Sequence, residues 1–201
     1  MNSIEIGRLL RANITACVVG CRVAQVNVPA FGAMVRIPLE DGLDIYGLIH
    51  DIRIEDDGLV RQLVTTEGIS EEVILDNRQN RNVPLEISVL FAGYVLGGEV
   101  RHLLPPRPPL TLDAIYPCAA AELRGFTQHG RFGYFRHVLR AADLPIGELL
   151  AAHLQQAQQA HRAAGNPGWL SAATQELITL LRDDYPTLMG VLAAIGDCVE
   201  E

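Results

Sequence analysis

Histidine and arginine side chains supply most of the chemistry that this sequence could perform, and they gather in three places. His50 is followed directly by Asp51 in a segment of alternating polar and apolar residues. A carboxylate that orients an imidazole is an arrangement used in general-base catalysis. Adjacent residues of a strand point to opposite faces, so the two side chains cannot make that pair directly. The pattern favours a surface pair or a pair at the end of a barrel.

Four arginines form the second set: Arg78, Arg81, Arg101 and Arg107. The first two lie between two predicted elements, and the other two lie where the chain leaves the predicted barrel. If these guanidinium groups converge, they can bind an acidic partner surface or a phosphate. Ordinary solvated arginines are the alternative, and the sequence does not separate the two.

The third set surrounds a glycine-bearing loop at Gly125–Gly133. We take His129, Arg131 and His137 as candidates for a site at the junction between the predicted barrel and the predicted helices. The histidines of this region lack metal-ligand spacing such as H-E-x-x-H. We therefore expect no metal site, and no motif suggests a cofactor.

Several enzyme classes are excluded by what the chain lacks. All 16 basic residues are arginine, so a G-x-x-x-x-G-K-[ST] phosphate loop and lysine Schiff-base chemistry are both absent. No G-x-S-x-G nucleophile elbow occurs. The four cysteines lack zinc spacing and fit buried thiols in a reducing compartment. The sequence therefore favours a protein that is not an enzyme.

Composition limits the partners and the location. The net charge of −8 makes the chain a poor candidate for direct nucleic-acid binding, which depends on neutralising phosphates. No apolar run approaches the roughly 18 residues of a membrane helix. The N-terminus has no basic region followed by an apolar one, so we expect no signal peptide and a cytoplasmic protein.

Residues 1–110 are predicted to form a small antiparallel β-barrel, because short β-branched segments alternate with turn signals. The predicted strands are Ile4–Arg11, Thr15–Arg22, Gly32–Leu39, Leu43–Ile54, Val83–Tyr94 and Glu99–Leu104. Asp41-Gly42 and Gly97-Gly98 indicate tight turns. The proline cluster Pro105–Pro109 predicts a stiff, extended exit from the barrel.

Residues 111–201 are predicted to form a helical annex, which packs on itself and on the barrel and makes the fold α+β. Alanine, leucine and glutamine replace the β-branched residues here. The first helix begins near Ala114 or, after Pro117, at about Cys118. Further helices are predicted at Tyr134–Ala142, Asp143–Arg162, Trp169–Asp184 and Pro186–Val199. Asp143 is expected to cap the longest of them.

The order of these segments carries a family resemblance. I-G-R-L-L, F-G-A-M-V-R-I, Y-G-L-I-H-D-I, L-E-I-S-V-L-F-A-G-Y and V-R-H-L-L-P-P-R-P-P follow one another between residues 4 and 110. This order resembles the HerA–ATP synthase (HAS) barrel of HerA-type DNA translocases and rotary ATPases. A PRC-type barrel is the competing match. In the HAS family the barrel mediates assembly and contacts to partners, and it leads into an ATPase core that this chain lacks.

Three functions remain open. The resemblance favours a binding or assembly module that docks a protein partner, either a HerA-type ATPase or an associated nuclease in DNA processing. A structural homo-oligomer, in which the helices pair with copies of themselves, is the first alternative. An enzyme with a site at the barrel–helix junction is the second; a deep polar cleft there would favour it.

Overall fold

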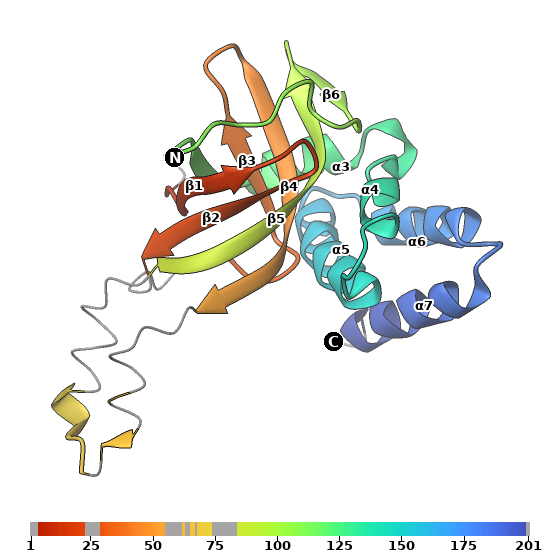
Figure 1. Cartoon of the computed structure of the whole chain (residues 1–201). Coiled ribbons are helices and arrows are strands. Elements are labelled where there is room, and N and C mark those ends of the chain that lie inside the picture. The colour runs from red at the N-terminus through yellow and green to blue at the C-terminus, as the bar shows by residue number, and fades with distance from the viewer. Residues whose placement is uncertain are drawn as a thin grey trace.

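The computed structural model describes residues 4–22, 29–54, 62, 65–66, 68–73 and 84–199 (Figure 1). An antiparallel β-barrel of six strands is followed by a mostly helical C-terminal region, which confirms the predicted α+β fold. Figure 1 shows the helices gathered on one side of the barrel. No helix among the described residues is long and apolar enough to cross a membrane.

Seven strands form one continuous sheet. They are β1 (Gly7–Ala12), β2 (Ala16–Arg22), β3 (Met34–Pro38), β4 (Leu43–Ile54), β5 (Pro84–Leu96), β6 (Glu99–Arg101) and β7 (Ala114–Pro117). Their order in the sheet is β2-β1-β7-β3-β4-β5-β6, and an additional β2–β5 pairing closes the barrel. The short β6 lies outside the closed ring and pairs only with the end of β5.

The closing strand β7 lies beyond residue 110, where the sequence analysis ended the barrel. It pairs with β1 through Ile115 opposite Gly7 and with β3 through Tyr116 opposite Arg36, both antiparallel. The proline cluster before it is therefore no exit from the barrel, because the chain returns to the sheet. Four residues that end in a proline are too few to show the alternation by which the longer strands were found.

Alternating side chains give the barrel two apolar faces. The inner set fills the barrel and includes Leu9, Val35, Ile45, Val89 and Ile115, each at most 1% exposed. The outer set on β3, β4 and β5 joins the core of the helical region instead. A strand that is apolar on both faces is covered on both sides, and here the helices cover the outer face.

The helical region contains five helices and one 3₁₀ turn. They are α3 (Ala120–Thr127), η1 (Gly130–Phe132), α4 (Phe135–Leu139), α5 (Ile146–Ala163), α6 (Trp169–Leu180) and α7 (Tyr185–Val199). The helix α3 begins after Pro117. Of the two starting points that the sequence allowed, the later one is therefore correct. Asp143 is not the cap of α5: it lies in the preceding loop with φ of 59°, and Pro145 takes the N-cap position.

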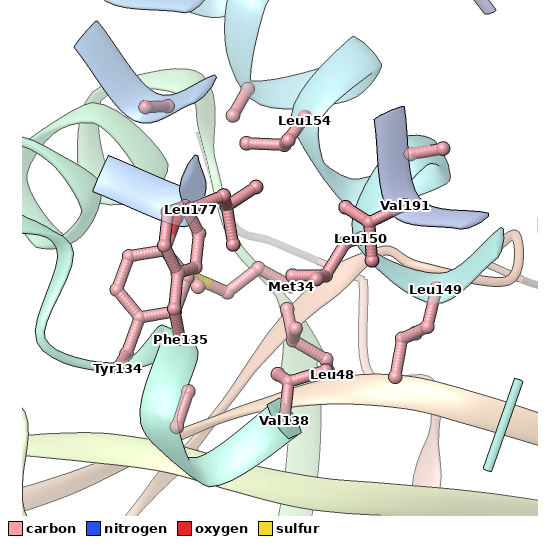
Figure 2. Packing of buried hydrophobic residues seen from close by; sticks show 14 of the residues in the cluster. Met34, Leu48, Tyr134, Phe135, Val138, Leu149, Leu150, Leu154, Leu177 and Val191 are labelled. Carbon is pink, nitrogen blue, oxygen red and sulfur yellow. The ribbon is translucent and has the colours of Figure 1, made fainter. Parts of the chain in front are cut away.

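The contact between barrel and helices is densely packed. Met34 and Leu48 of the barrel meet Tyr134, Phe135 and Val138 of the α4 segment (Figure 2). Leu149, Leu150, Leu154, Leu177 and Val191 complete the labelled part of this cluster from α5, α6 and α7. Burial of large apolar side chains in one continuous cluster stabilises the two parts against each other.

A glycine allows the closest approach between the two parts. Gly32, in the loop before β3, has φ of +79°, and a Cβ atom there would lie 2.7 Å from the Cβ of Ala152 on α5. Gln156 of α5 donates a hydrogen bond from Nε2 to the carbonyl of Phe31, at 3.1 Å. The loop and the helix therefore lie closer together than a larger side chain at position 32 would allow, and the Gln156 hydrogen bond joins them.

Candidate functional site

The junction residues chosen from the sequence lie near one another without forming a common site. His129 is exposed, with Nδ1 2.9 Å from the carbonyl oxygen of Gly125. His137 is half-buried, with Nε2 3.2 Å from the carbonyl oxygen of His102. Arg131 lines a separate cavity of about 340 Å³ together with Arg136 and Glu176. Each histidine is thus occupied by a backbone carbonyl.

The histidine at the centre of this region is His102, which the sequence analysis did not single out. Its ring lies 4.8 Å from that of Phe126 and 5.1 Å from that of Tyr134, measured between centroids. Its Nε2 is 3.1 Å from the carbonyl oxygen of Phe126, and its own carbonyl accepts from Arg136. Burial, with a smaller contribution from the nearby Arg136 guanidinium, lowers the pKa of His102 to about 4.

Two further histidines are buried in the same seam. His153 is fully buried, and its Nε2 lies 3.0 Å from the Tyr134 hydroxyl. Burial lowers the pKa of His153 to about 4. His161 stacks on Trp169 at 4.5 Å between ring centroids, and its Nε2 is 2.8 Å from Thr127 Oγ1. These neutral imidazoles are hydrogen-bonded parts of the packing, not groups that face a substrate.

The sequence offered one signal for His102, which is the pair of glycines in the following loop. A Cβ atom on Gly130 would lie 3.1 Å from His102 Nδ1, and one on Gly133 would lie 3.4 Å from the same atom. A side chain at Gly130, where φ is +56°, would crowd the imidazole, so glycine at this position lets the loop close over it. Within the described residues, no group of three or more histidine, cysteine, aspartate or glutamate side chains could hold a metal ion.

Two of the four arginines proposed to bind a partner have carboxylate partners of their own. Arg101 pairs with Glu99 at 2.9 Å on β6, and Arg107 pairs with Asp41 of the β3–β4 turn at 2.8 Å. Arg78 and Arg81 lie outside the residues that the structure describes. Convergence of the four arginines stays a prediction.

A second surface is defined by apolar side chains that the packing leaves out. The segment from Leu103 to Leu112, which we call the leucine–proline strap, joins β6 to β7 and crosses the barrel (Figure 1). Four of its ten residues are exposed leucines: Leu103 is 52% exposed, Leu104 40%, Leu110 65% and Leu112 63%. The sequence analysis marked the prolines of this segment but not the leucines around them.

The strap is fixed to the barrel at several points. Pro105 and Pro109 are buried, while Pro106 and Pro108 are exposed. The Leu112 amide donates to the carbonyl of Leu9 at 2.9 Å. The strap's only charged side chain, Arg107, is held by its ion pair with the β3–β4 turn. Prolines with fixed φ angles and these anchors hold the exposed leucines in place.

An ordered, nearly uncharged segment that exposes several large apolar side chains is typical of a protein-contact surface. The charged side chain of the strap, Arg107, is already paired with Asp41. What the strap can do chemically is to bury apolar area against a complementary surface.

Comparison with protein-family models and with curated proteins finds no match for this chain. The fold that the structure establishes is a six-stranded antiparallel β-barrel with a helical region after it.

Proposed function

We propose that this protein is a non-enzymatic assembly module that docks a protein partner through the leucine–proline strap. The observation that carries the proposal is the exposure of four leucines within ten anchored residues of the barrel surface. Large apolar side chains that are exposed together on one ordered segment are a feature of protein-contact surfaces. The barrel then serves as the rigid support of the contact.

The class of partner follows from the resemblance to the HAS barrel. The order of strands up to β6 and the proline-rich segment after it are the features on which that resemblance rests. In that family the barrel mediates assembly with partner proteins, so we propose a HerA-type ATPase or an associated nuclease as the partner. The chain departs from the family pattern after the prolines, where β7 and the helices take the place of the motor.

The packing at the junction supports a binding module over an enzyme. Tyr134, Phe135 and Val138 are each 0% exposed, and they fill the space between the barrel and α5. The two histidines that were candidates for a junction site, His129 and His137, are bonded to backbone carbonyls, and Arg131 lines a separate cavity. A site for catalysis on a substrate needs an open cleft with free polar groups, which this part of the junction does not provide.

A structural homo-oligomer is the second candidate, favoured by one observation. Leu180, Tyr185 and Met189 are exposed large apolar residues at the corner where α6 passes into α7. If this corner pairs with a second copy, the oligomer depends on these side chains and not on the strap.

The test compares two double variants by quantitative binding and by light scattering. Leu104→Ser with Leu110→Ser alters the strap; Leu180→Ser with Met189→Ser alters the corner and serves as the matched control. The purified partners are the HerA-type ATPase and the associated nuclease from the same organism. We expect the strap variant to bind at least roughly tenfold more weakly and the corner variant to bind as the wild type does.

Two results would contradict the proposal. One is wild-type affinity in the strap variant; the other is failure of the wild type to bind either partner protein. A stable oligomer that dissociates only in the corner variant would establish the homo-oligomer instead. Circular dichroism and thermal melting confirm that both variants are folded before binding is compared.

A further inference from the structure

A cavity of about 340 Å³ is lined by residues of the 3₁₀ turn η1, of α4 and of the second half of α6. We call it the η1–α6 cavity. Its charged residues are Arg131, Arg136 and Glu176, and its large apolar residues are Phe132 and Leu180. The cavity is separate from the leucine–proline strap and from the buried histidines, because no residue of either lines it.

Two of the three charged side chains have no partner in the part of the chain that the structure describes. Neither Arg131 nor Glu176 makes an ion pair or a side-chain hydrogen bond there. Their charges are opposite and both residues line one cavity, yet they do not pair with each other. A ligand that carries both a negative and a positive charge can satisfy each of them.

The third charged group, Arg136, is held in place by the backbone. Its guanidinium donates to the carbonyl of His102, and it forms no ion pair within the described ranges. A guanidinium carries five N–H donors in a fixed fork, so a bond to one carbonyl leaves other donors for a ligand. Arg136 thus adds an oriented positive charge to the wall of the cavity.

The turn that carries Arg131 is fixed by aromatic packing. Arg131 and Phe132 both have left-handed backbones, with φ of 48° and 57°. This conformation is costly for residues other than glycine, and neighbouring contacts must maintain it. The ring of Phe132 stacks on Phe135 at 5.4 Å and meets the ring of Trp169 at 5.7 Å, measured between centroids. The packing of Phe132 therefore holds the backbone of Arg131 beside the cavity.

The three charges select a ligand that is both an anion and a cation. Glu176 repels a simple anion such as acetate, and the two guanidinium groups repel a simple cation. A carboxylate is the natural partner of arginine, which binds it through charge-assisted hydrogen bonds. An ammonium group is the matching partner of Glu176. The apolar surface of Phe132 and Leu180 remains for an uncharged part of the same molecule.

We propose that the η1–α6 cavity binds a free α-amino acid with an apolar side chain. The carboxylate of the ligand accepts hydrogen bonds from Arg131 and Arg136, and its ammonium group donates to Glu176. Its side chain packs on Phe132 and Leu180. Ligand pockets span roughly 300 to 1,000 Å³, and a cavity at the lower end of this range suits a small molecule. This site does not depend on the proposed function.

The test titrates L-leucine into the full chain at constant ionic strength and measures its affinity by calorimetry. NMR locates the binding through the Leu180 methyl groups and the indole of Trp169, which packs against Phe132. Three comparison ligands each lack one part. N-acetyl-L-leucine lacks the ammonium, L-leucinamide lacks the carboxylate, and glycine lacks the apolar side chain. We expect saturable binding of L-leucine and at least roughly tenfold weaker binding of each comparison ligand.

Two variants assign the charges of the ligand to residues. Arg131→Asn removes a guanidinium, and asparagine tolerates the left-handed backbone, so the turn is retained. It should weaken binding of L-leucine roughly tenfold or more and leave binding of L-leucinamide unchanged. Glu176→Gln removes the carboxylate charge and keeps the size of the side chain. It should weaken binding of L-leucine by a similar factor without weakening that of N-acetyl-L-leucine.

Arg162→Gln and Glu148→Gln are the matched controls, because both side chains are exposed and neither lines the cavity. Both should bind L-leucine as the wild type does. The proposal is overturned if L-leucine does not saturate the wild type. It is also overturned if Arg131→Asn or Glu176→Gln binds L-leucine as tightly as the wild type, or if each variant weakens all the ligands equally.

Discussion

The barrel–helix junction and the leucine–proline strap are built from similar residues and behave in opposite ways. Both are rich in apolar side chains. At the junction, Phe135 and Leu149 are 0% exposed within a shared core. On the strap, Leu110 is 65% exposed although the segment around it is anchored to the barrel. The apolar side chains of the first region are buried within the chain, whereas those of the second are exposed to solvent.

The difference shows how polar groups are used in each region. At the junction, one ring nitrogen of His102 is bonded to the backbone and one of His153 to the Tyr134 hydroxyl, so these polar side chains are built into the packing. The strap has one charged residue, which is tied to Asp41 and so cannot compete with apolar contact. Removing a junction side chain should therefore lower the free energy of unfolding strongly, whereas removing a strap side chain should change it little.

The largest effect tests this contrast directly. Phe135→Ala removes a fully buried ring from the cluster and should lower the free energy of unfolding by about 3–5 kcal/mol. Leu110→Ala on the strap should change it by less than about 0.5 kcal/mol. Denaturant unfolding, followed by the fluorescence of the single tryptophan, Trp169, measures both. A strap variant as unstable as Phe135→Ala would end the distinction between the two regions.

The next effect is a loss of stability at acidic pH, which the buried histidines of the junction cause. The unfolded chain protonates His153 near its ordinary pKa of 6.5, but the folded protein does so only near 4. The unfolded state thus binds more protons between these values, so stability is constant above about pH 6.5 and falls as the pH drops towards 4. For His153 the loss is about 2 kcal/mol at pH 5. His102 should add a similar loss.

His153→Gln sharpens this prediction, because glutamine can hydrogen-bond to Tyr134 but does not titrate. The variant should lose less stability between pH 7 and pH 5 than the wild type does. Denaturant unfolding at each pH measures the difference. An unchanged pH profile in the variant would show that the buried imidazole does not cause the acid sensitivity.

The smallest effect is the difference in stability between two glycine variants, and it tests the close approach of the loop to α5. Gly32→Ala places a Cβ 2.7 Å from Ala152 in a backbone with φ of +79°. Gly42→Ala is the matched control, with φ of +75° and nothing within 4 Å. Both variants carry the strain of a left-handed backbone, about 1 to 2 kcal/mol, and Gly32→Ala should lose about 1 to 2 kcal/mol more from the contact. Equal losses in thermal melts would mean that the loop moves away easily.

Local patterns predicted the fold well where structure is decided locally. The Asp41-Gly42 turn, the long β4 and the helices after Pro145 follow from turn chemistry and periodicity, and the structure contains them. β7 was missed because its strand character depends on β1 and β3, which lie more than 70 residues earlier in the chain. Four residues carry too little pattern to reveal such partners.

The sites were less predictable because they depend on irregularity and burial. The histidines around Gly125–Gly133 were visible from the sequence, but the carbonyls that occupy them were not. Strand alternation was taken to place His50 and Asp51 on opposite faces. That argument fails here, because β4 has a bulge between Ile49 and Asp51. The bulge arises from the register between β4 and β5, which neither strand's sequence displays. The exposure of the strap leucines likewise depends on how the prolines lie against the barrel.

The late position of β7 has a consequence for synthesis of the chain. Until residue 117 has left the ribosome, β1 and β3 lack the neighbour that lies between them, and their edges stay unpaired. Unpaired edges are templates for association with other chains. The barrel can close only after Ala114–Pro117, the residues of β7, have been synthesised. The helices that cover the outer face of the barrel follow β7 directly in the chain. Closure of the barrel is therefore followed at once by burial of that face.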